Sequence, residues 1–106
     1  MTDVRLVLMT APDAALAGQI AERLVEEELV ACGNIVPGIR SIYRWEGKVC
    51  EDAEVLVVFK TLAEKVPLVS ERIQALHPYD CPEVVSLPVD GGSKAYLDWV
   101  GAMVRS

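Results

Sequence analysis

The chain has 106 residues, a length that predicts one domain spanning residues 1–106. Hydrophobic residues make up 52% of it, which is enough for a core. This fraction is slightly high for a small monomer and therefore favours an oligomer. Its formal net charge of −6 argues against binding to nucleic acid or membranes through a basic patch. The charge is compatible with attracting cations, but simple solubility is the explanation we favour. No stretch approaches the roughly 20 apolar residues that span a bilayer, and we expect no signal peptide.

The first part of the chain predicts a strand followed by a helix. Residues 4–9 are apolar except for Arg5, which is typical of a central strand. Asp13 is placed to cap a helix whose apolar side chains recur at helical spacing. Three glutamates at 26–28 follow at its C-terminal end, where negative charge opposes the helix dipole, so we expect a solvated end.

A long β-hairpin is predicted next. Residues 34–45 and 49–61 are β-branched, apolar runs separated by the turn 46–48, which contains Gly47. Both runs are about twice the usual five or six residues, so the hairpin should project beyond the sheet. Its tip carries Tyr43 and Trp45, and a neighbouring subunit is the simplest cover for them.

Pro37 and Gly38 interrupt the first strand of this hairpin. Proline cannot donate to a strand ladder, and glycine tolerates the geometry of a bulge. The strand should therefore bend at this point, and its distal half is expected to leave its own sheet and pair elsewhere, with a neighbouring subunit.

The second half of the chain predicts a helix, a strand and a last helix. The helix should start near Glu64, because Pro67 is tolerated only in the first turn, and end before Pro78. Residues 83–89 predict a strand, and Ser93 is placed to cap the last helix. The order βαββαβ plus a C-terminal helix predicts an α+β fold of the ferredoxin-like, split β-α-β type.

Short motifs in register along the chain resemble the CutA family of divalent-ion tolerance proteins. They are Asn34-Ile35-Val36-Pro37-Gly38, Ser41-Ile42-Tyr43, Trp45 with Gly47-Lys48, Lys60-Thr61, His77-Pro78-Tyr79, Pro82-Glu83, and the flanking Thr10-Ala11-Pro12 and Tyr96-Leu97 with Trp99. The resemblance covers nearly the whole chain. It implies ferredoxin-like subunits in a tight homotrimer, with a function in tolerance of copper and similar ions.

His77 is the single histidine and lies at the predicted end of the second helix. There it can bond the last helical carbonyls, or it can ligate copper or zinc if it finds further partners. Glu54 and Glu83 are the best carboxylate partners, and each is expected to open a strand; the alternative is that both are solvated surface carboxylates. The resemblance implies that both positions lie near clefts between subunits.

The sequence departs from the copper site proposed for the family. The first-strand cysteine of that site is Met9 here, and the second histidine that some relatives carry before His77 is Leu76. Both departures weaken a thiolate–imidazole copper site, and Met9 is more typical of core packing. Cys32 fits the family's Ala-Cys pattern, and we expect it to be mainly a small buried hydrophobe.

A second candidate site combines a lysine with aromatic side chains. Lys60 ends the second hairpin strand, where it can hold an anion or extend along the sheet edge. The resemblance implies that it points toward a cleft with Tyr43, Trp45 and Tyr79, which would suit a small-molecule ligand. Tyr43 and Trp45 are also typical anchors of a subunit interface, which is the interpretation we favour.

No sequence motif indicates catalysis or a required cofactor, so we predict that the protein is not an enzyme. The odd number of cysteines without CxxC spacing favours reduced thiols and a cytosolic location. We predict a cytosolic homotrimer that binds a divalent metal such as copper or zinc, or a small anionic ligand, and neither nucleic acid nor membrane. The alternatives are a PII-like signalling trimer, by analogy of fold, and a stable trimeric scaffold for partner proteins.

Overall fold

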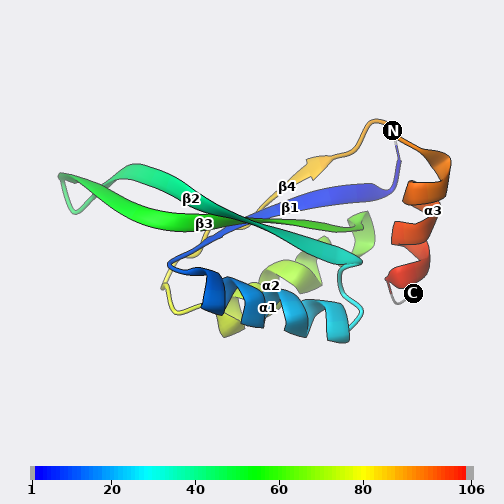
Figure 1. Cartoon of the computed structure of the whole chain (residues 1–106), viewed down its shortest axis with the longest axis horizontal. Coiled ribbons are helices and arrows are strands. Elements are labelled where there is room, and N and C mark those ends of the chain that lie inside the picture. The colour runs from blue at the N-terminus through cyan, green and yellow to red at the C-terminus, as the bar shows by residue number, and fades with distance from the viewer. Residues whose placement is uncertain (1, 105–106) are drawn as a thin grey trace.

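A four-stranded antiparallel sheet forms the centre of the molecule, with two helices on one face and a third helix at one end (Figure 1). The computed structural model describes residues 2–104. In chain order the elements are β1 (Val4–Ala11), α1 (Ala14–Glu26), β2 (Cys32–Trp45), β3 (Lys48–Leu62), the 3-10 turn η1 (Ala63–Lys65), α2 (Val66–Leu76), β4 (Val85–Pro88) and α3 (Lys94–Met103). The strand order β2-β3-β1-β4 confirms the predicted ferredoxin-like fold.

The long hairpin is confirmed and gives the molecule a longest dimension of 45 Å (Figure 1). Trp45 pairs with Lys48, so the turn contains only Glu46 and Gly47 rather than the predicted 46–48. Both turn residues have positive φ, +50° and +77°, which is the geometry of a two-residue hairpin turn whose twist matches that of the strands. Lys48 therefore belongs to the strand.

The predicted bend at Pro37-Gly38 is a β-bulge. Val36 lies opposite Leu56, and the next paired residue, Ile39, lies opposite Glu54. The prediction that the distal half leaves its own sheet is wrong within one chain, because β2 stays paired with β3 from Ile39 to Trp45. Gly38 has φ +77°, a conformation that is strained for residues with a Cβ. The bulge sets the register of the distal hairpin and so fixes which residues flank Glu54.

The sequence also predicted the caps and the ends of the helices. Asp13 accepts a hydrogen bond from the Leu16 amide at 2.8 Å, and Ser93 accepts one from the Tyr96 amide at 3.4 Å. Pro67 lies in the first turn of α2, after η1, and the helix ends at Leu76. Each cap satisfies one of the amides that have no partner within the helix.

The main core lies between the sheet and the helices α1 and α2. It includes the fully buried side chains Val7, Met9, Leu24, Val57, Phe59, Val69 and Ile73. Met9 is therefore packed in the interior, as the core interpretation of this residue predicted. A smaller cluster, in which Val100 of α3 packs with Val4, closes the end of the sheet.

The face of the sheet opposite α1 and α2 is largely apolar and only partly covered. We call it the open sheet face; its apolar cross-strand neighbours are Leu6, Leu8, Val36, Leu56, Val58, Val85 and Leu87, and it also carries the polar residues Thr10, Asn34 and Lys60. Val36 is 42% exposed, and Val85 is 48% exposed. An exposed apolar patch that is bordered by polar side chains indicates an interaction surface.

The last predicted strand is shorter than expected. The regular part of β4 is Val85–Pro88 rather than 83–89, so Glu83 precedes the strand. Val89 still donates to the Val4 carbonyl at 3.3 Å and accepts from the Thr2 amide at 3.1 Å, but this pairing is irregular. β1, in contrast, continues two residues beyond its predicted end, to Ala11.

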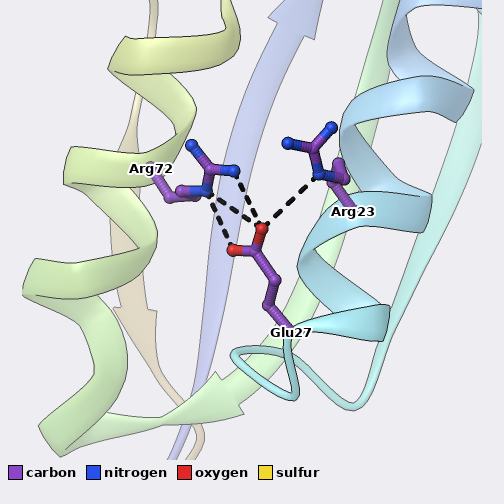
Figure 2. A network of polar contacts seen from close by, with 3 residues as sticks. All are labelled: Arg23, Glu27 and Arg72. Carbon is purple, nitrogen blue, oxygen red and sulfur yellow. Dashed lines mark hydrogen bonds and ion pairs between the residues drawn. The ribbon is translucent and has the colours of Figure 1, made fainter.

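The expectation that the acidic end of α1 is solvated is wrong for Glu27. Arg72 of α2 donates to both of its carboxylate oxygens, from Nε to Oε1 at 2.9 Å and from Nη2 to Oε2 at 2.8 Å (Figure 2). Arg23 lies 3.5 Å away on the other side. These bonds, chiefly those from Arg72, lower the pKa of Glu27 and connect the two helices.

This pairing predicts a pH-dependent loss of stability when Arg72 is removed. Because the pKa of Glu27 is lower in the folded state than its ordinary value of 4.5, the pair stabilises the fold above that value. The contribution is lost as pH falls through the folded pKa. Arg72→Gln should therefore lower the Tm relative to wild type at pH 7, and the difference should shrink progressively as the pH falls below 4.5.

Thermal unfolding of both proteins between pH 7 and 3.5 checks this prediction. Arg44→Gln is the matched control, because Arg44 is an exposed arginine next to the hairpin turn, where it pairs with Val49. A Tm difference for Arg72→Gln that stays constant over the whole pH range would contradict the role given to the Glu27 carboxylate.

Candidate functional site

An open groove of about 820 Å³ lies between the distal hairpin and the loop 77–84. Its walls carry the aromatic residues Tyr43, Trp45 and Tyr79. Two smaller hollows have neither aromatic nor histidine side chains: one of about 330 Å³ lies along α1, and one of about 550 Å³ lies between the C-terminal ends of α1 and α3. The aromatic groove is the candidate site, because aromatic walls with a few polar groups are typical of binding pockets.

The groove is strongly acidic. Its lining includes four carboxylates: Asp52, Glu54, Asp80 and Glu83. The one basic side chain in the lining is Arg40, whose Nε donates to Glu51 at 2.8 Å. The groove therefore favours a cation over an anion.

Glu54 is the buried carboxylate of the groove. It lies within β3, opposite Ile39, and so does not open a strand as the sequence predicted. The side chain is 9% exposed, and its Oε2 accepts a hydrogen bond from the Tyr79 hydroxyl at 3.0 Å. Burial, with added effect from this bond, raises the pKa of Tyr79 to about 12, so the phenol keeps its proton and remains a donor.

His77 contacts both the backbone amide and the ring of Tyr79. Its Nδ1 accepts a hydrogen bond from the Tyr79 amide at 3.2 Å, and its Nε2 lies 2.8 Å from the Thr10 carbonyl oxygen. Since a carbonyl only accepts, Nε2 carries the proton and donates. The two rings are also in contact, with centroids 4.5 Å apart.

The histidine thus has no free lone pair in this arrangement. From the sequence, one interpretation was that His77 bonds the last carbonyls of its own helix. The carbonyl that its ring contacts is instead that of Thr10 in β1. The ring is 7% exposed and lies behind Tyr79 rather than in the groove lining. A metal ion could bind His77 only by displacing one of its two hydrogen bonds.

Two of the three predicted metal ligands come together. Glu54 and Glu83 both line the groove, whereas His77 does not. Within residues 2–104 no group of three or more histidine, cysteine, aspartate or glutamate side chains is arranged to hold a metal ion. The assignment of these residues as metal ligands stays a prediction.

The aromatic residues Tyr43 and Trp45 lie near the hairpin tip, as the predicted long strands required. Tyr43 donates from its hydroxyl to the Asp52 carboxylate, and this bond raises the pKa of Tyr43 to about 12. Trp45 is 58% exposed. Sequence reasoning missed Asp52 and Asp80, although Asp52 lies two residues before Glu54 and so on the same face of the strand.

Lys60 and Cys32 lie at the other end of the sheet, paired with each other across β2 and β3. Lys60 donates to the side-chain carbonyl of Asn34, and the Cys32 sulfur lies 3.7 Å from the Tyr96 hydroxyl. Cys32 is half-buried, with a polar neighbour, rather than fully buried as expected.

The cleft that the resemblance implied, with Lys60 beside the tip aromatics, does not form within one chain. Along β3, Lys60 is about 26 Å from Asp52 at the ~3.3 Å per residue of a strand. Residues from a second chain would be needed to bring this lysine and Tyr43 into one cleft.

Comparison with known proteins identifies the relatives of the chain. The family model described as "CutA1 divalent ion tolerance protein" matches residues 5–103. The "Divalent-cation tolerance protein CutA" of Thermus thermophilus is 53% identical over 95 residues, covering 90% of this chain and 92% of the relative. A "Protein CutA homolog" of Xenopus laevis is 47% identical over 96 residues; the match covers 91% of this chain but only 64% of that longer protein.

A solved structure shows the same fold. The divalent cation tolerance protein Cut A1 from Thermus thermophilus superposes with a TM-score of 0.94 at 49% sequence identity. The match covers 96% of this chain and 99% of that structure. None of the helices between residues 2 and 104 is long and apolar enough to cross a membrane.

Proposed function

We propose that this chain, which belongs to the CutA1 divalent ion tolerance family, acts by binding a divalent cation in the acidic groove. The observation that carries this proposal is the convergence of Glu54 and Glu83, which are distant in sequence, on one groove with two further carboxylates. Carboxylate oxygens are suitable ligands for divalent cations, including zinc. The binding is not coupled to catalysis in this proposal, in keeping with a family named for tolerance rather than for a reaction.

The acting unit in this proposal is a homotrimer. The open sheet face supports this assembly, because a chain of this size gains stability when such a surface is buried. In the trimer, the hairpins pair with neighbouring chains, so Lys60 can approach the tip aromatics of another chain and offer a place for a small anionic ligand. The three free cysteines support a reducing, cytosolic location.

Calorimetric titration of Cu(II), Zn(II) and Ni(II) into the chelator-treated protein tests the proposal. We expect about one site per chain for at least one of these ions. Glu83→Gln should weaken binding at least tenfold, because removing a charged ligand loses one of the stronger contacts available. Copper is included because imidazole suits copper, so the titration also tests the prediction from the sequence that His77 is a ligand.

Glu71→Gln provides the matched control, since it removes the same charge from an exposed position on α2 outside the groove. Equal loss of affinity in Glu71→Gln and Glu83→Gln would mean that the acidic surface merely collects cations. That result would overturn the groove as the site.

A second candidate function is a trimer that senses a small organic molecule. The three aromatic walls and the volume of about 820 Å³ favour it, because the groove is much larger than a bare ion requires. A thermal-shift screen separates the two functions: stabilisation by a metabolite without any effect of metal ions would favour ligand sensing.

A further inference from the structure

The segment 89–93 joins β4 to α3 and contains an Asp-Gly pair, Asp90-Gly91, followed by Gly92. It forms neither helix nor strand, and these three residues are exposed. Among the residues that the structure describes, no group bonds to the Asp90 carboxylate, and the Gly91 amide donates no backbone hydrogen bond. The carboxyl group is therefore free to turn toward the amide nitrogen that follows it in the chain.

The other aspartates of the chain lack this combination. Three of them already accept a hydrogen bond through the carboxylate: Asp13, Asp52 and Asp98. The remaining two, Asp3 and Asp80, precede residues that carry a Cβ. A side chain on the following residue hinders the approach of its amide nitrogen, and glycine has none. A free carboxylate followed by glycine therefore occurs at Asp90 alone among the aspartates that the structure describes.

We propose that Asp90-Gly91 is a site of spontaneous isoaspartate formation, a covalent modification of the loop that leads into α3. The Gly91 nitrogen attacks Cγ of the Asp90 carboxyl group, and a five-membered succinimide ring forms. The amide proton and the carboxyl hydroxyl leave together as one water. Water then opens the ring at either carbonyl, which returns aspartate or gives isoaspartate, whose backbone runs through Cβ and Cγ. The sum is an isomerisation that needs no oxidant, reductant or other reactant.

The modification adds one methylene group to the backbone between two anchored points. On one side, Val89 donates to the Val4 carbonyl at 3.3 Å and accepts from the Thr2 hydroxyl at 2.9 Å. On the other side, Ser93 caps α3 by accepting from the Tyr96 amide at 3.4 Å. The longer connection therefore changes how the loop holds the first turn of α3. The main core between the sheet and the helices α1 and α2 contains no residue of this loop.

Incubation of the whole chain for several weeks at physiological temperature and pH tests the proposal. Peptide mapping with electron-transfer dissociation distinguishes isoaspartate from aspartate, although the two have the same mass. A purified isoaspartyl methyltransferase gives a second readout, because it transfers a methyl group from S-adenosylmethionine to the α-carboxylate that isoaspartate exposes. We expect isoaspartate to accumulate at residue 90 and not at the other aspartates.

Three variants separate the chemistry from the fold. Gly91→Ala should slow the accumulation several-fold, and the fold accommodates it, because no atom lies within 4 Å of the added Cβ and φ is not in the left-handed region. Asp90→Glu keeps the charge but would need a six-membered ring, which closes far more slowly, so the methyl label should be lost. Gly101→Ala is the matched control, because its Cβ also meets open space and no aspartate precedes it.

The absence of isoaspartate at residue 90 of the folded chain would overturn the proposal, even if a synthetic peptide of residues 86–96 forms it, because the loop would then prevent ring closure. An unchanged rate in Gly91→Ala, or equal amounts at another aspartate, would overturn it as well. Hydrogen exchange of the Tyr96 amide, measured by NMR, should be faster in the aged protein. Unchanged exchange would show that the added methylene group does not reach α3.

Discussion

Leu8→Glu is expected to convert the proposed homotrimer into a folded single chain. Leu8 lies at the centre of the open sheet face, next to Val58 on β3 and Val85 on β4. In one chain the side chain is only half-buried, so a glutamate there can still reach water. In a trimer that covers this face, the same carboxylate would be buried without a partner, at a cost of several kcal/mol per chain.

Light scattering measures this result directly. We expect the mass to fall from about three times to once the chain mass of 11.6 kDa, with helix and strand content retained by circular dichroism. Leu68→Glu is the matched control, because Leu68 is 47% exposed on α2, away from the open sheet face. A Leu8→Glu variant that keeps the trimeric mass would show that this face is not the interface.

Phe59→Ala should produce the largest loss of stability of any single change considered. Phe59 is fully buried in β3, and truncation of such a side chain costs about 3–5 kcal/mol. That is a large part of the roughly 5–15 kcal/mol that stabilises a domain. The Phe59 ring packs directly on Gly33, where an added Cβ would lie 2.9 Å from two of its carbons.

This contact predicts opposite effects of one substitution in two backgrounds. Gly33→Ala should destabilise wild type by about 1–3 kcal/mol through overpacking, but it should be neutral or stabilising in Phe59→Ala, where it fills part of the cavity. Chemical denaturation of the four proteins at one fixed concentration gives the coupling. Equal effects of Gly33→Ala in both backgrounds would contradict the packing described.

The sequence predicted the parts of the fold that depend on local chemistry. Asp13 and Ser93 identified helix starts, because each places a side-chain acceptor directly before apolar residues at helical spacing, where it can accept from a free backbone amide of the first turn. Pro37-Gly38 identified the bulge for a similarly local reason. These features need no knowledge of distant contacts, so they could be read directly.

The candidate site depended on contacts that no local pattern contains. Glu54 and Tyr79 meet across 25 residues, and His77 meets Thr10 across 67. The sequence supplied Tyr79, Glu54 and Glu83 as candidates, but it did not show that His77 lies behind Tyr79. Lys60 was grouped with the tip aromatics through the resemblance, although the length of β3 separates them in one chain.

The ion pair of Glu27 with Arg72 could not be predicted from the sequence for the same reason. A run of three glutamates at a helix end predicts solvation when only that helix is considered. Arg72 reverses this expectation because α2 packs beside α1 and presents a bidentate donor there (Figure 2). Only the packing of the two helices brings these side chains together.

The most direct test of the central claim is anomalous diffraction at the zinc absorption edge, from crystals of the wild-type protein grown with one equivalent of Zn(II) per chain. The account predicts one strong anomalous peak per chain in the acidic groove, within bonding distance of Glu83 and Glu54. Peaks confined to other surface carboxylates, or a groove without zinc, would contradict it.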